Sequence, residues 1–447
     1  MSFPRYPAYK DSGVEWLGEV PGHWEISQLK HAYSVIGGST PSSGVPQFWD
    51  GDIVWVTPAD LSRLKSFKIV SSLRTITDAG LASCGTNLLP VGSIVLSTRA
   101  PIGSLGVAGT ELCTNQGCKG LVPKSEQCSG FGAYLLAVMG GELNIRGRGT
   151  TFLELSSEAL CEVKIPLPPE PEQGAIAAFL DRETAKIDAL VAEQQDLIAL
   201  LKEKRQALIS HAVTKGLDPD VPMKDSGVAW LGEVPAHWLV TPLKYLASSI
   251  KAGPFGSALT KDMYVAAGYR VYGQEQVIPG DFTVGDYYIS DGVFDELSQY
   301  AVAPGDLLIS CVGTFGKIAI VPDDVEPGII NPRLIRLRVR SDVKAGFLCE
   351  VLRSQVVFEQ FAVLSRGGTM DVINIGTLSN IYVPCPPLEE QQRILSFLAK
   401  SLLGIDSLVA EADATIALLQ ERRTALISAA VTGKIDVRHL APTPEPA

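Results

Sequence analysis

The chain contains one unit twice, and this internal repeat constrains the fold more than any other feature. Residues 10–30 (KDSGVEWLGEVPGHWEISQLK) and 224–244 (KDSGVAWLGEVPAHWLVTPLK) are identical at 15 of 21 positions. Residues 165–217 and 383–435 are identical at 27 of 53 positions. Because both copies must fold in the same way, the repeat governs the prediction of every element within it. The 447 residues therefore form two related halves.

Between these matched blocks the two halves diverge, and only short correspondences remain. LLPVGSIVLS (88–97) parallels AVAPGDLLIS (301–310), and Asn115 parallels Asn331. We expect the two halves to share a backbone and to differ in their surfaces. A protein that keeps its scaffold and varies its surface is most simply one that reads two different ligands.

Each matched block contains a long proline-free run with regularly spaced apolar residues. These residues are Ile176, Leu180, Ile187, Leu190, Leu197, Leu201 and Leu208, then Ile394, Leu398, Ile405, Leu408, Leu419 and Leu426. The spacing predicts a helix with one apolar seam in each half, about 65 Å long at ~1.5 Å per residue. We expect the helices to pair antiparallel, as a coiled-coil-like spar with a globular domain at each end, because the halves are related by an approximate two-fold axis. The alternative is that each helix packs only on its own domain.

The variable segments alternate short apolar runs with glycine, proline, asparagine and aspartate turns, which is typical of strands. DIVWV, SIVLS, DLLIS and KIAIV are such runs, whereas FGAYLLAVM and AGFLCEVLRSQVVFEQF predict short helices. The predicted fold class is mixed α/β (α+β), with a twisted, largely antiparallel sheet in each of two globular domains.

The repeat also predicts the domain organisation. It comprises an N-terminal segment (1–24), a first globular domain (25–165), a central helical region (166–217), a linker that repeats the N-terminal segment (218–238), a second globular domain (239–383), a C-terminal helical region (384–435) and a flexible tail (436–447). In the middle of the chain, the KDSGV…HW block directly follows a helix. By symmetry, the C-terminal helix should therefore end near the N-terminus.

Composition and cysteine usage predict a soluble, cytoplasmic protein. Apolar residues make up 46% of the chain, which is enough for more than one core. Its eight cysteines form no CxxC pair, so they predict reduced thiols rather than a zinc site or a disulfide framework. Neither a signal peptide nor a run of 18 apolar residues is apparent in the sequence.

The net charge of −11 argues against a stand-alone DNA-binding protein, which usually has a basic face. However, residues 25–165 hold 11 basic and 11 acidic residues, and residues 239–383 hold 12 and 15, so the acid excess lies mostly on helices and linkers. Two basic clusters could still face phosphates: Arg146 with Arg148, and Arg333 with Arg336, Arg338 and Arg340. For the second cluster, the alternative is a solvated strand face. We expect weak DNA binding alone and tighter binding within a complex.

The sequence lacks the motifs of several catalytic classes. Gly316-Lys317 is followed by Ile318 and does not form a phosphate-binding loop. The Pro-Pro pairs are LPPE and CPPL, without the neighbours that an adenine methyltransferase needs. Glu162-Val163-Lys164 has no equivalent in the second half, so we interpret it as a strand edge rather than a nuclease triplet. His23 and His237, beside repeated tryptophans, are interpreted as packing corners.

Several strings in order resemble the specificity subunits of type I restriction-modification enzymes. They include KDSGVEWLGEVPGHW, GGSTPSS, FWDGDIVWVTPADL, STRAPIG, TNQG, GTTFLELS, KAGPFGSAL, APGDLLIS, GTFGK and VPCPPLEEQQRI. The resemblance spans almost the whole chain. It implies two target-recognition domains for double-stranded DNA and two helical regions that dock two methyltransferase subunits. It also implies ATP-driven restriction/translocase subunits that complete the complex, and no catalytic residue or metal site in this chain. S-adenosylmethionine, ATP and Mg are expected on the partner subunits, and no cofactor on this one.

Base edges in the major groove specify sequence, whereas phosphate contacts position the protein. Candidate DNA-binding residues are therefore polar or basic side chains in loops beside glycine. They are Ser39, Thr40, Arg99, Asn115, Gln116, Lys119, Arg146, Arg148, Thr150 and Thr151 in the first domain, and Lys251, Ser257, Gln274, Lys317, Asn331, Arg333, Arg366 and Thr369 in the second. For each one, the alternative is that it caps a turn or satisfies the backbone.

Two other functions compete with DNA specificity. One is a scaffold whose variable domains bind protein or RNA ligands. The other is a self-contained methyltransferase, which the missing motif argues against. The sequence does not specify the bases of the target, because readout also depends on loop geometry and on the shape of the DNA.

Overall fold

A computed structural model describes residues 3–99, 101–124, 127–147, 154–311, 317–364 and 373–440. The chain divides into two compact units. Unit 1 comprises Met1–Gln194 and Ala414–Ala447, and unit 2 comprises Gln195–Asp413. Each unit therefore holds one globular domain and a part of each long helix.

Unit 1 contains a five-stranded sheet in the order β4-β11-β8-β9-β6 and a three-stranded sheet in the order β10-β5-β7. Its strands are β1 (Tyr9–Asp11), β2 (Glu19–Pro21), β3 (Glu25–Gln28), β4 (Tyr33–Gly37), β5 (Trp49–Val56), β6 (Lys68–Ile69), β7 (Arg74–Ile76), β8 (Ile94–Ser97), β9 (Leu105–Ala108), β10 (Leu112–Thr114), β11 (Cys118–Pro123) and β12 (Lys164–Leu167). Its short helices are α1 (Leu29–Ala32), η1 (Pro46–Phe48), α2 (Pro58–Leu61), α3 (Asp78–Ser83), α4 (Ser129–Val138), α5 (Gly140–Arg146) and α6 (Ser157–Cys161).

Unit 2 contains two four-stranded sheets, in the orders β16-β23-β20-β21 and β17-β19-β18-β22. Its strands are β13 (Met223–Asp225), β14 (Glu233–Pro235), β15 (Leu239–Pro242), β16 (Ala247–Ala252), β17 (Tyr264–Val265), β18 (Tyr269–Tyr272), β19 (Tyr288–Ile289), β20 (Leu307–Ser310), β21 (Ile318–Ile320), β22 (Gly328–Ile330), β23 (Leu334–Val339) and β24 (Tyr382–Cys385). Its short helices are η2 (Leu243–Tyr245), η3 (Gly256–Ala258), η4 (Lys261–Met263), α8 (Gln274–Val277), α9 (Asp291–Glu296), η5 (Ser298–Tyr300), α10 (Ala345–Arg353), α11 (Gln355–Leu364) and α12 (Ile375–Asn380).

The two globular domains share one topology beneath their different sequences. The order β4-β11-β8-β9 in unit 1 corresponds to β16-β23-β20-β21 in unit 2, and all these pairings are antiparallel. The parallel pair β5 and β10 corresponds to the parallel pair β18 and β22. The correspondence of Gly92 with Gly305 also holds, because both have a positive φ and donate to equivalent carbonyls. The predicted mixed α/β fold with largely antiparallel sheets is confirmed.

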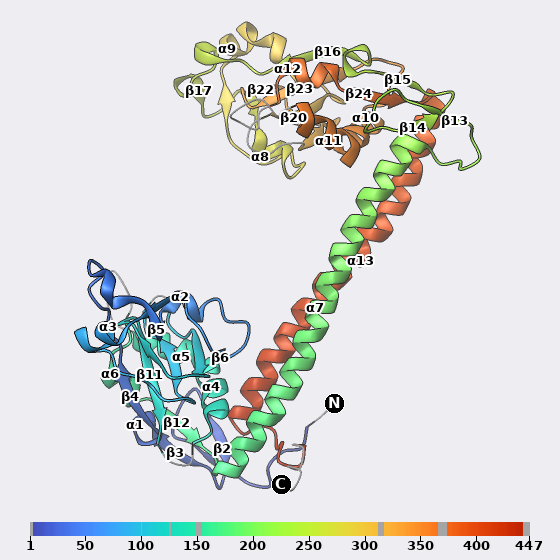
Figure 1. Cartoon of the computed structure of the whole chain (residues 1–447). Helices are drawn as coiled ribbons and strands as arrows, with labels where there is room; N and C mark the ends of the chain where they lie inside the picture. The colour runs from blue at the N-terminus through green and yellow to red at the C-terminus, as the bar shows by residue number, and fades with distance from the viewer. Residues whose placement is uncertain are drawn as a thin grey trace. The chain divides into compact units, whose positions relative to one another are not determined.

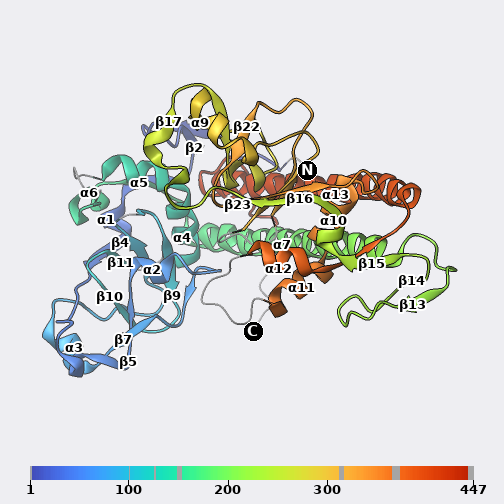
Figure 2. The same ribbon diagram turned by 90° about the horizontal axis from the view of Figure 1, so that it is seen from above.

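The long helices are α7 (Glu170–Lys215) and α13 (Leu388–Val431), and they lie side by side in the views of Figures 1 and 2. In unit 1, Arg423 of α13 pairs with Asp188 of α7, with the closest nitrogen and oxygen 2.8 Å apart. In unit 2, Arg205 of α7 pairs with Asp406 of α13 at 3.3 Å. The start of each helix therefore packs against the end of the other, which confirms the antiparallel pair and excludes helices that pack only on their own domains.

The predicted seam is only partly buried. Ile176 and Leu180 of α7, and Ile394 and Leu398 of α13, are buried within the cores of the globular domains. By contrast, Leu190, Leu197 and Leu408 are exposed, although they lie on the same predicted seam. The two helices therefore pair as predicted, whereas these three leucines of the predicted seam are exposed.

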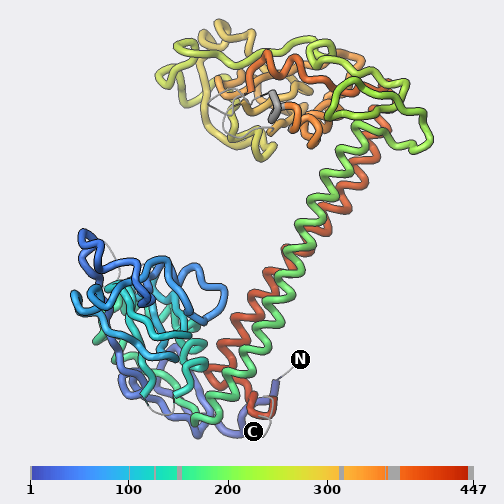
Figure 3. Tube along the Cα trace, in the orientation of Figure 1, coloured from blue at the N-terminus to red at the C-terminus, as the bar shows by residue number. Residues whose placement is uncertain are grey.

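The C-terminal helix ends beside the start of the chain, as the repeat predicts. Within unit 1, the Tyr9 hydroxyl donates to the carbonyl of Gly433 at 3.1 Å. The Asp436 backbone N–H donates to the carbonyl of Pro4 at 2.8 Å. The blue start and the red end of the tube accordingly lie together in Figure 3.

A repeated Glu-Gln pair in the first turn of each long helix explains part of the sequence identity. Glu172 lies 2.8 Å from the His23 ring nitrogen and accepts a hydrogen bond from Trp24. Glu390 lies 2.8 Å from the His237 ring nitrogen in the same way. A carboxylate is also favourable at a helix N-terminus. Both histidines therefore contact the first turn of a long helix through their ring nitrogens.

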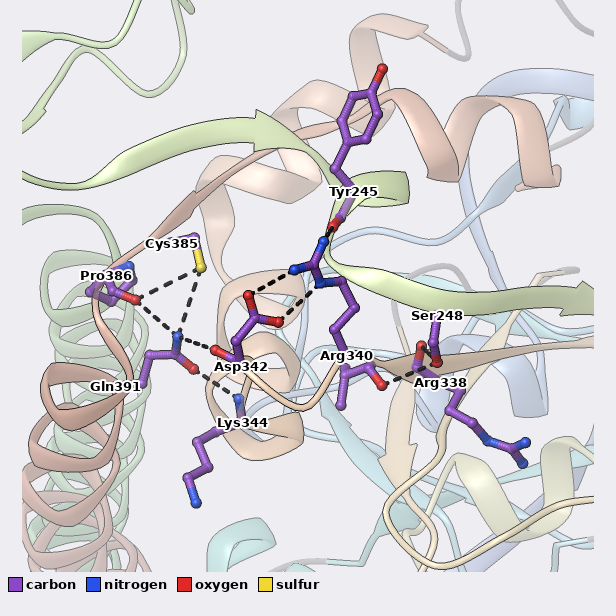
Figure 4. A network of polar contacts seen from close by, with 10 residues as sticks. Tyr245, Ser248, Arg338, Arg340, Asp342, Lys344, Cys385, Pro386 and Gln391 are labelled. Carbon is purple, nitrogen blue, oxygen red and sulfur yellow. Dashed lines mark hydrogen bonds and ion pairs between the residues drawn. The ribbon is translucent and has the colours of Figure 1, made fainter.

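The glutamine of each pair joins the helix to its globular domain. Gln391 accepts a hydrogen bond from the Lys344 N–H at 2.8 Å and donates to the Pro386 carbonyl at 2.9 Å (Figure 4). Gln173 accepts from the Cys128 N–H at 3.0 Å at the equivalent place. Both amides are buried. The loop that leads into α10 or α4 is therefore tied to the start of the long helix.

The remaining sequence predictions of structure concern cysteines, the acidic triplet and membranes. All eight cysteines are free thiols, and burial raises the pKa of Cys118 and of Cys349 to about 12.

Glu162 follows the end of α6, Val163 is buried and Lys164 begins β12, in agreement with a strand edge. No helix among the described residues is long and apolar enough to cross a membrane.

Candidate nucleic-acid interface

Four connections meet at one edge of the globular domain in unit 1, which we call loop edge 1. They are residues 38–40, 57–60, 98–99 and 115–117, which follow β4, β5, β8 and β10. The register explains why they meet: Gly37 at the end of β4 pairs with Lys119, and Ser97 at the end of β8 pairs with Cys118. Both partners lie at the start of β11. Antiparallel neighbours thus bring connections far apart in sequence to the same edge.

The turn at residues 115–117 organises loop edge 1. The Asn115 N–H donates to the carbonyl of Val56 at 3.0 Å, and its side-chain oxygen accepts from the Gly117 N–H at 2.9 Å. Such a self-bonded asparagine stabilises a turn. Nearby, the Thr40 hydroxyl donates to the side-chain carbonyl of Gln116. Thr40 and Gln116 are exposed, whereas Asn115 is half-buried.

The equivalent loop edge 2 of unit 2 comprises residues 253–257, 273–276, 310–311, 317 and 331–333. The Asn331 N–H donates to the carbonyl of Tyr272 at 2.8 Å, and its side-chain oxygen accepts from the Arg333 N–H at 2.9 Å. The Gln274 amide donates to the Ser310 hydroxyl at 2.7 Å within the same edge. The backbone geometry of loop edge 1 is therefore repeated with other side chains.

One glycine in each edge permits this geometry. A Cβ atom on Gly38 would overlap the carbonyl oxygen of Asn115, and a Cβ on Gly253 would overlap that of Asn331. Only glycine lets the two backbone segments approach so closely. The segments 38–40 and 253–257 are thus fixed against the asparagine turns.

The structure separates the sequence candidates into two groups at these edges. The side chains of Asn115 and Asn331 accept backbone N–H groups within their own turns, as the structural alternative describes. Ser39 lies beside the first turn, where its backbone N–H donates to the Thr114 carbonyl. The exposed candidates are Thr40, Gln116, Ser257, Lys317 and Arg333, together with Arg99, which forms an exposed ion pair with Glu154. Exposed pairs contribute little to stability, so the Arg99 guanidinium is accessible to another partner.

The other candidates lie elsewhere. Lys119 and Lys251 are on strands β11 and β16 next to the edges, and Lys251 donates to Gln299. Arg146 pairs with Glu142 and lines a hollow with Trp16 rather than joining the loop-edge contacts. Arg148, Thr150, Thr151, Arg366 and Thr369 lie outside the described residues.

Of the basic cluster Arg333, Arg336, Arg338 and Arg340, only Arg336 is buried, which corrects both sequence interpretations for that residue alone. Arg336 is only 5% exposed, so it lies neither on a solvated face nor against phosphates. Asp306, itself 1% exposed, accepts two hydrogen bonds from Arg338 at 2.8 Å and lies 4.0 Å from Arg336. Arg340 pairs with Asp342. Burial lowers the pKa of Arg336, and repulsion from Arg338 adds to this effect.

Sequence reasoning missed Asp306 and Arg270, two buried charged residues of the second globular domain. Arg270 is buried and donates to the carbonyls of Thr283 and Val284 while pairing with Glu326. In the sequence, each residue is marked only as a charged residue within an apolar run. Arg270 is the second residue of YRVY (269–272), and Asp306 is the first residue of DLLIS (306–310).

A shared backbone that carries different exposed side chains at two equivalent loop edges defines a recognition protein. A family model described as the type I restriction modification DNA specificity domain matches residues 21–199 and 259–408, more than half of the chain. The chain belongs to this family. It is a type I restriction-modification specificity subunit with DNA-binding target-recognition domains, a non-catalytic member of its system.

Individual relatives agree with this assignment. The MjaIX specificity subunit of Methanocaldococcus jannaschii is 38% identical over 166 residues, which are 37% of this chain and 38% of that protein. The match thus spans less than half of that relative. The putative MjaX specificity subunit of the same organism is 24% identical over 94% of this chain and 96% of that protein.

Solved structures share the fold. A structure described as the basis of complex assembly and conformational transition of the type I R-M system matches with a TM-score of 0.67, at 20% identity, over 92% of this chain and 98% of that chain. The HsdS subunit from Thermoanaerobacter tengcongensis matches with a TM-score of 0.54, at 20% identity, over 93% of this chain and 98% of that chain.

Proposed function

We propose that this chain recognises an asymmetric bipartite DNA sequence, with one half-site read by each globular domain. The domains would be residues 25–165 and 239–383. The observation that carries the proposal is the pair of loop edges: the asparagine turn and the glycine approach recur, whereas the exposed side chains differ. Equivalent frames with different donors and acceptors suit two different base sequences.

The chain would direct partner subunits to this DNA. We propose two methyltransferase subunits and ATP-dependent restriction subunits, with S-adenosylmethionine, ATP and Mg bound by those partners. The long helices carry exposed leucines that are suited to docking, namely Leu190 in unit 1 and Leu197 and Leu408 in unit 2. The acidic net charge of −11 fits a chain that binds DNA firmly only with its partners.

The decisive experiment maps N6-methyladenine across the genome in cells with the chain and its methyltransferase partner, and in cells without the chain. We expect a two-part motif that disappears when the chain is removed. The control exchanges residues 239–383 for those of a relative, which should change one half of the motif only. An unchanged methylation pattern without the chain would contradict the proposal and favour a scaffold for protein or RNA.

Arg333→Ala should weaken binding to the cognate DNA by about 5- to 150-fold, the range expected when a specific base contact is lost. Arg333 is exposed in the asparagine turn of loop edge 2. Affinity of the complex would be measured on cognate and non-cognate duplexes at one salt concentration. Arg340→Ala removes the same charge from the Asp342 pair and should change affinity less than about twofold. An equal loss on non-cognate DNA would mean that Arg333 contacts phosphate instead.

A further inference from the structure

The two loop edges differ at one pair of equivalent positions beside their glycines. Gly38 and Gly253 occupy the same place against the asparagine turns, so Thr40 corresponds to Phe255. Thr40 is exposed and hydrogen-bonded to Gln116. Phe255 is 69% exposed. An apolar ring therefore stands where the first domain presents a hydroxyl.

The loop that carries Phe255 is held on both sides. The Gly253 N–H donates to the carbonyl of Leu334 at 2.9 Å, and Pro254 is buried. On the other side, Gly256 has a φ of 63°. Leu259 belongs to a hydrophobic core of the same unit. Because both flanks are fixed, the backbone of this loop keeps the Phe255 ring exposed.

The surroundings of Phe255 on this edge are polar and basic. Arg333 lies in the turn that Gly253 packs against, and Lys317 follows in the adjoining connection after β20. The Ser310 N–H donates to the Lys317 carbonyl at 2.9 Å, and the Cys311 N–H donates to the Arg333 carbonyl at 3.0 Å, which places both exposed cations at the same edge. Positively charged side chains can bind DNA phosphates and guanine edges, and an apolar side chain can contact the 5-methyl group of thymine.

We propose that Phe255 is a specificity-determining residue that reads a thymine in the second half-site through its 5-methyl group. The equivalent Thr40, with Gln116, reads the first half-site by hydrogen bonding. This inference rests on the proposed bipartite recognition. It predicts that one A·T pair of the second half-site is recognised by apolar contact alone.

The test replaces each thymine of the second half-site, one at a time, by deoxyuridine, which pairs identically and lacks only the methyl group. Affinity is measured for the full complex with its methyltransferase subunits. One replacement should weaken the native complex by about fourfold, the factor that corresponds to ~0.8 kcal/mol for one buried methyl-sized group. In Phe255→Ala, affinity for the unmodified duplex should fall by a similar factor, and the same replacement should have no further effect. Phe255→Leu should retain part of the methyl discrimination.

Tyr245→Ala is the matched control, because Tyr245 is a 59% exposed aromatic residue of the same domain outside loop edge 2. It should keep the full deoxyuridine penalty. The proposal is overturned if no replacement weakens the native complex, if Phe255→Ala keeps the penalty, or if the half-site contains no A·T pair. A complex that shows no preference for any two-part sequence would instead overturn the proposed function.

Discussion

Asp306→Ala should lower the free energy of unfolding by about 3–5 kcal/mol, the effect expected when one partner of a buried ion pair is removed. The carboxylate accepts from Arg338 and from the Ala303 N–H, each at 2.8 Å. Its loss would leave the Arg336 guanidinium buried without a counter-charge. Because Arg338 is 43% exposed and can return to water, most of the loss should come from Arg336.

Urea unfolding of the chain would measure this effect, with Asp342→Ala as the control. Asp342 forms an exposed pair with Arg340, so its replacement should cost less than about 1 kcal/mol. Arg336→Met in the Asp306→Ala background should restore part of the stability by removing the unpaired charge. Equal stability of the Asp306→Ala and Asp342→Ala variants would show that Asp306 does not hold the β20–β23 pair together.

Gln391→Leu should lower the free energy of unfolding by about 2–6 kcal/mol, because it leaves two buried polar groups without a partner and each costs about 1–3 kcal/mol. The change would remove the bonds to the Lys344 N–H and the Pro386 carbonyl. Amide hydrogen exchange at Lys344 should become faster as the loop loosens from α13. Because this loop belongs to the second globular domain and leads into α10, sequence-specific DNA binding should also weaken.

The neighbouring Gln392 supplies a matched control, since it is exposed on the same turn of the helix. Gln392→Leu should change the unfolding free energy by less than about 0.5 kcal/mol. Gln173→Leu should reproduce the effect of Gln391→Leu in unit 1, at the Cys128 N–H. If Gln391→Leu were as stable as Gln392→Leu, the repeated glutamine would have no anchoring role.

The candidate site was predictable where the two halves could be compared. Pairing Asn115 with Asn331 identified the turn at the centre of each loop edge, although the structure makes these residues the frame rather than the exposed surface. Phe255 was not among the candidates, because only polar and basic side chains were expected to contact DNA. Its correspondence with Thr40 follows from the close contacts of Gly38 with Asn115 and of Gly253 with Asn331, which the sequence does not reveal.

The repeat by itself determined two domains of one fold, two long helices and their antiparallel pairing, because identical segments must form identical structures. Only the tertiary structure decided which residues of these elements are buried. Arg336 and Asp306 are 30 positions apart, and the β20–β23 register, which places Arg336 opposite Leu308, brings them together. Leu190 and Leu408 follow the same apolar spacing as buried leucines yet are exposed. Periodicity specifies the face of an element, whereas burial depends on what packs against that face.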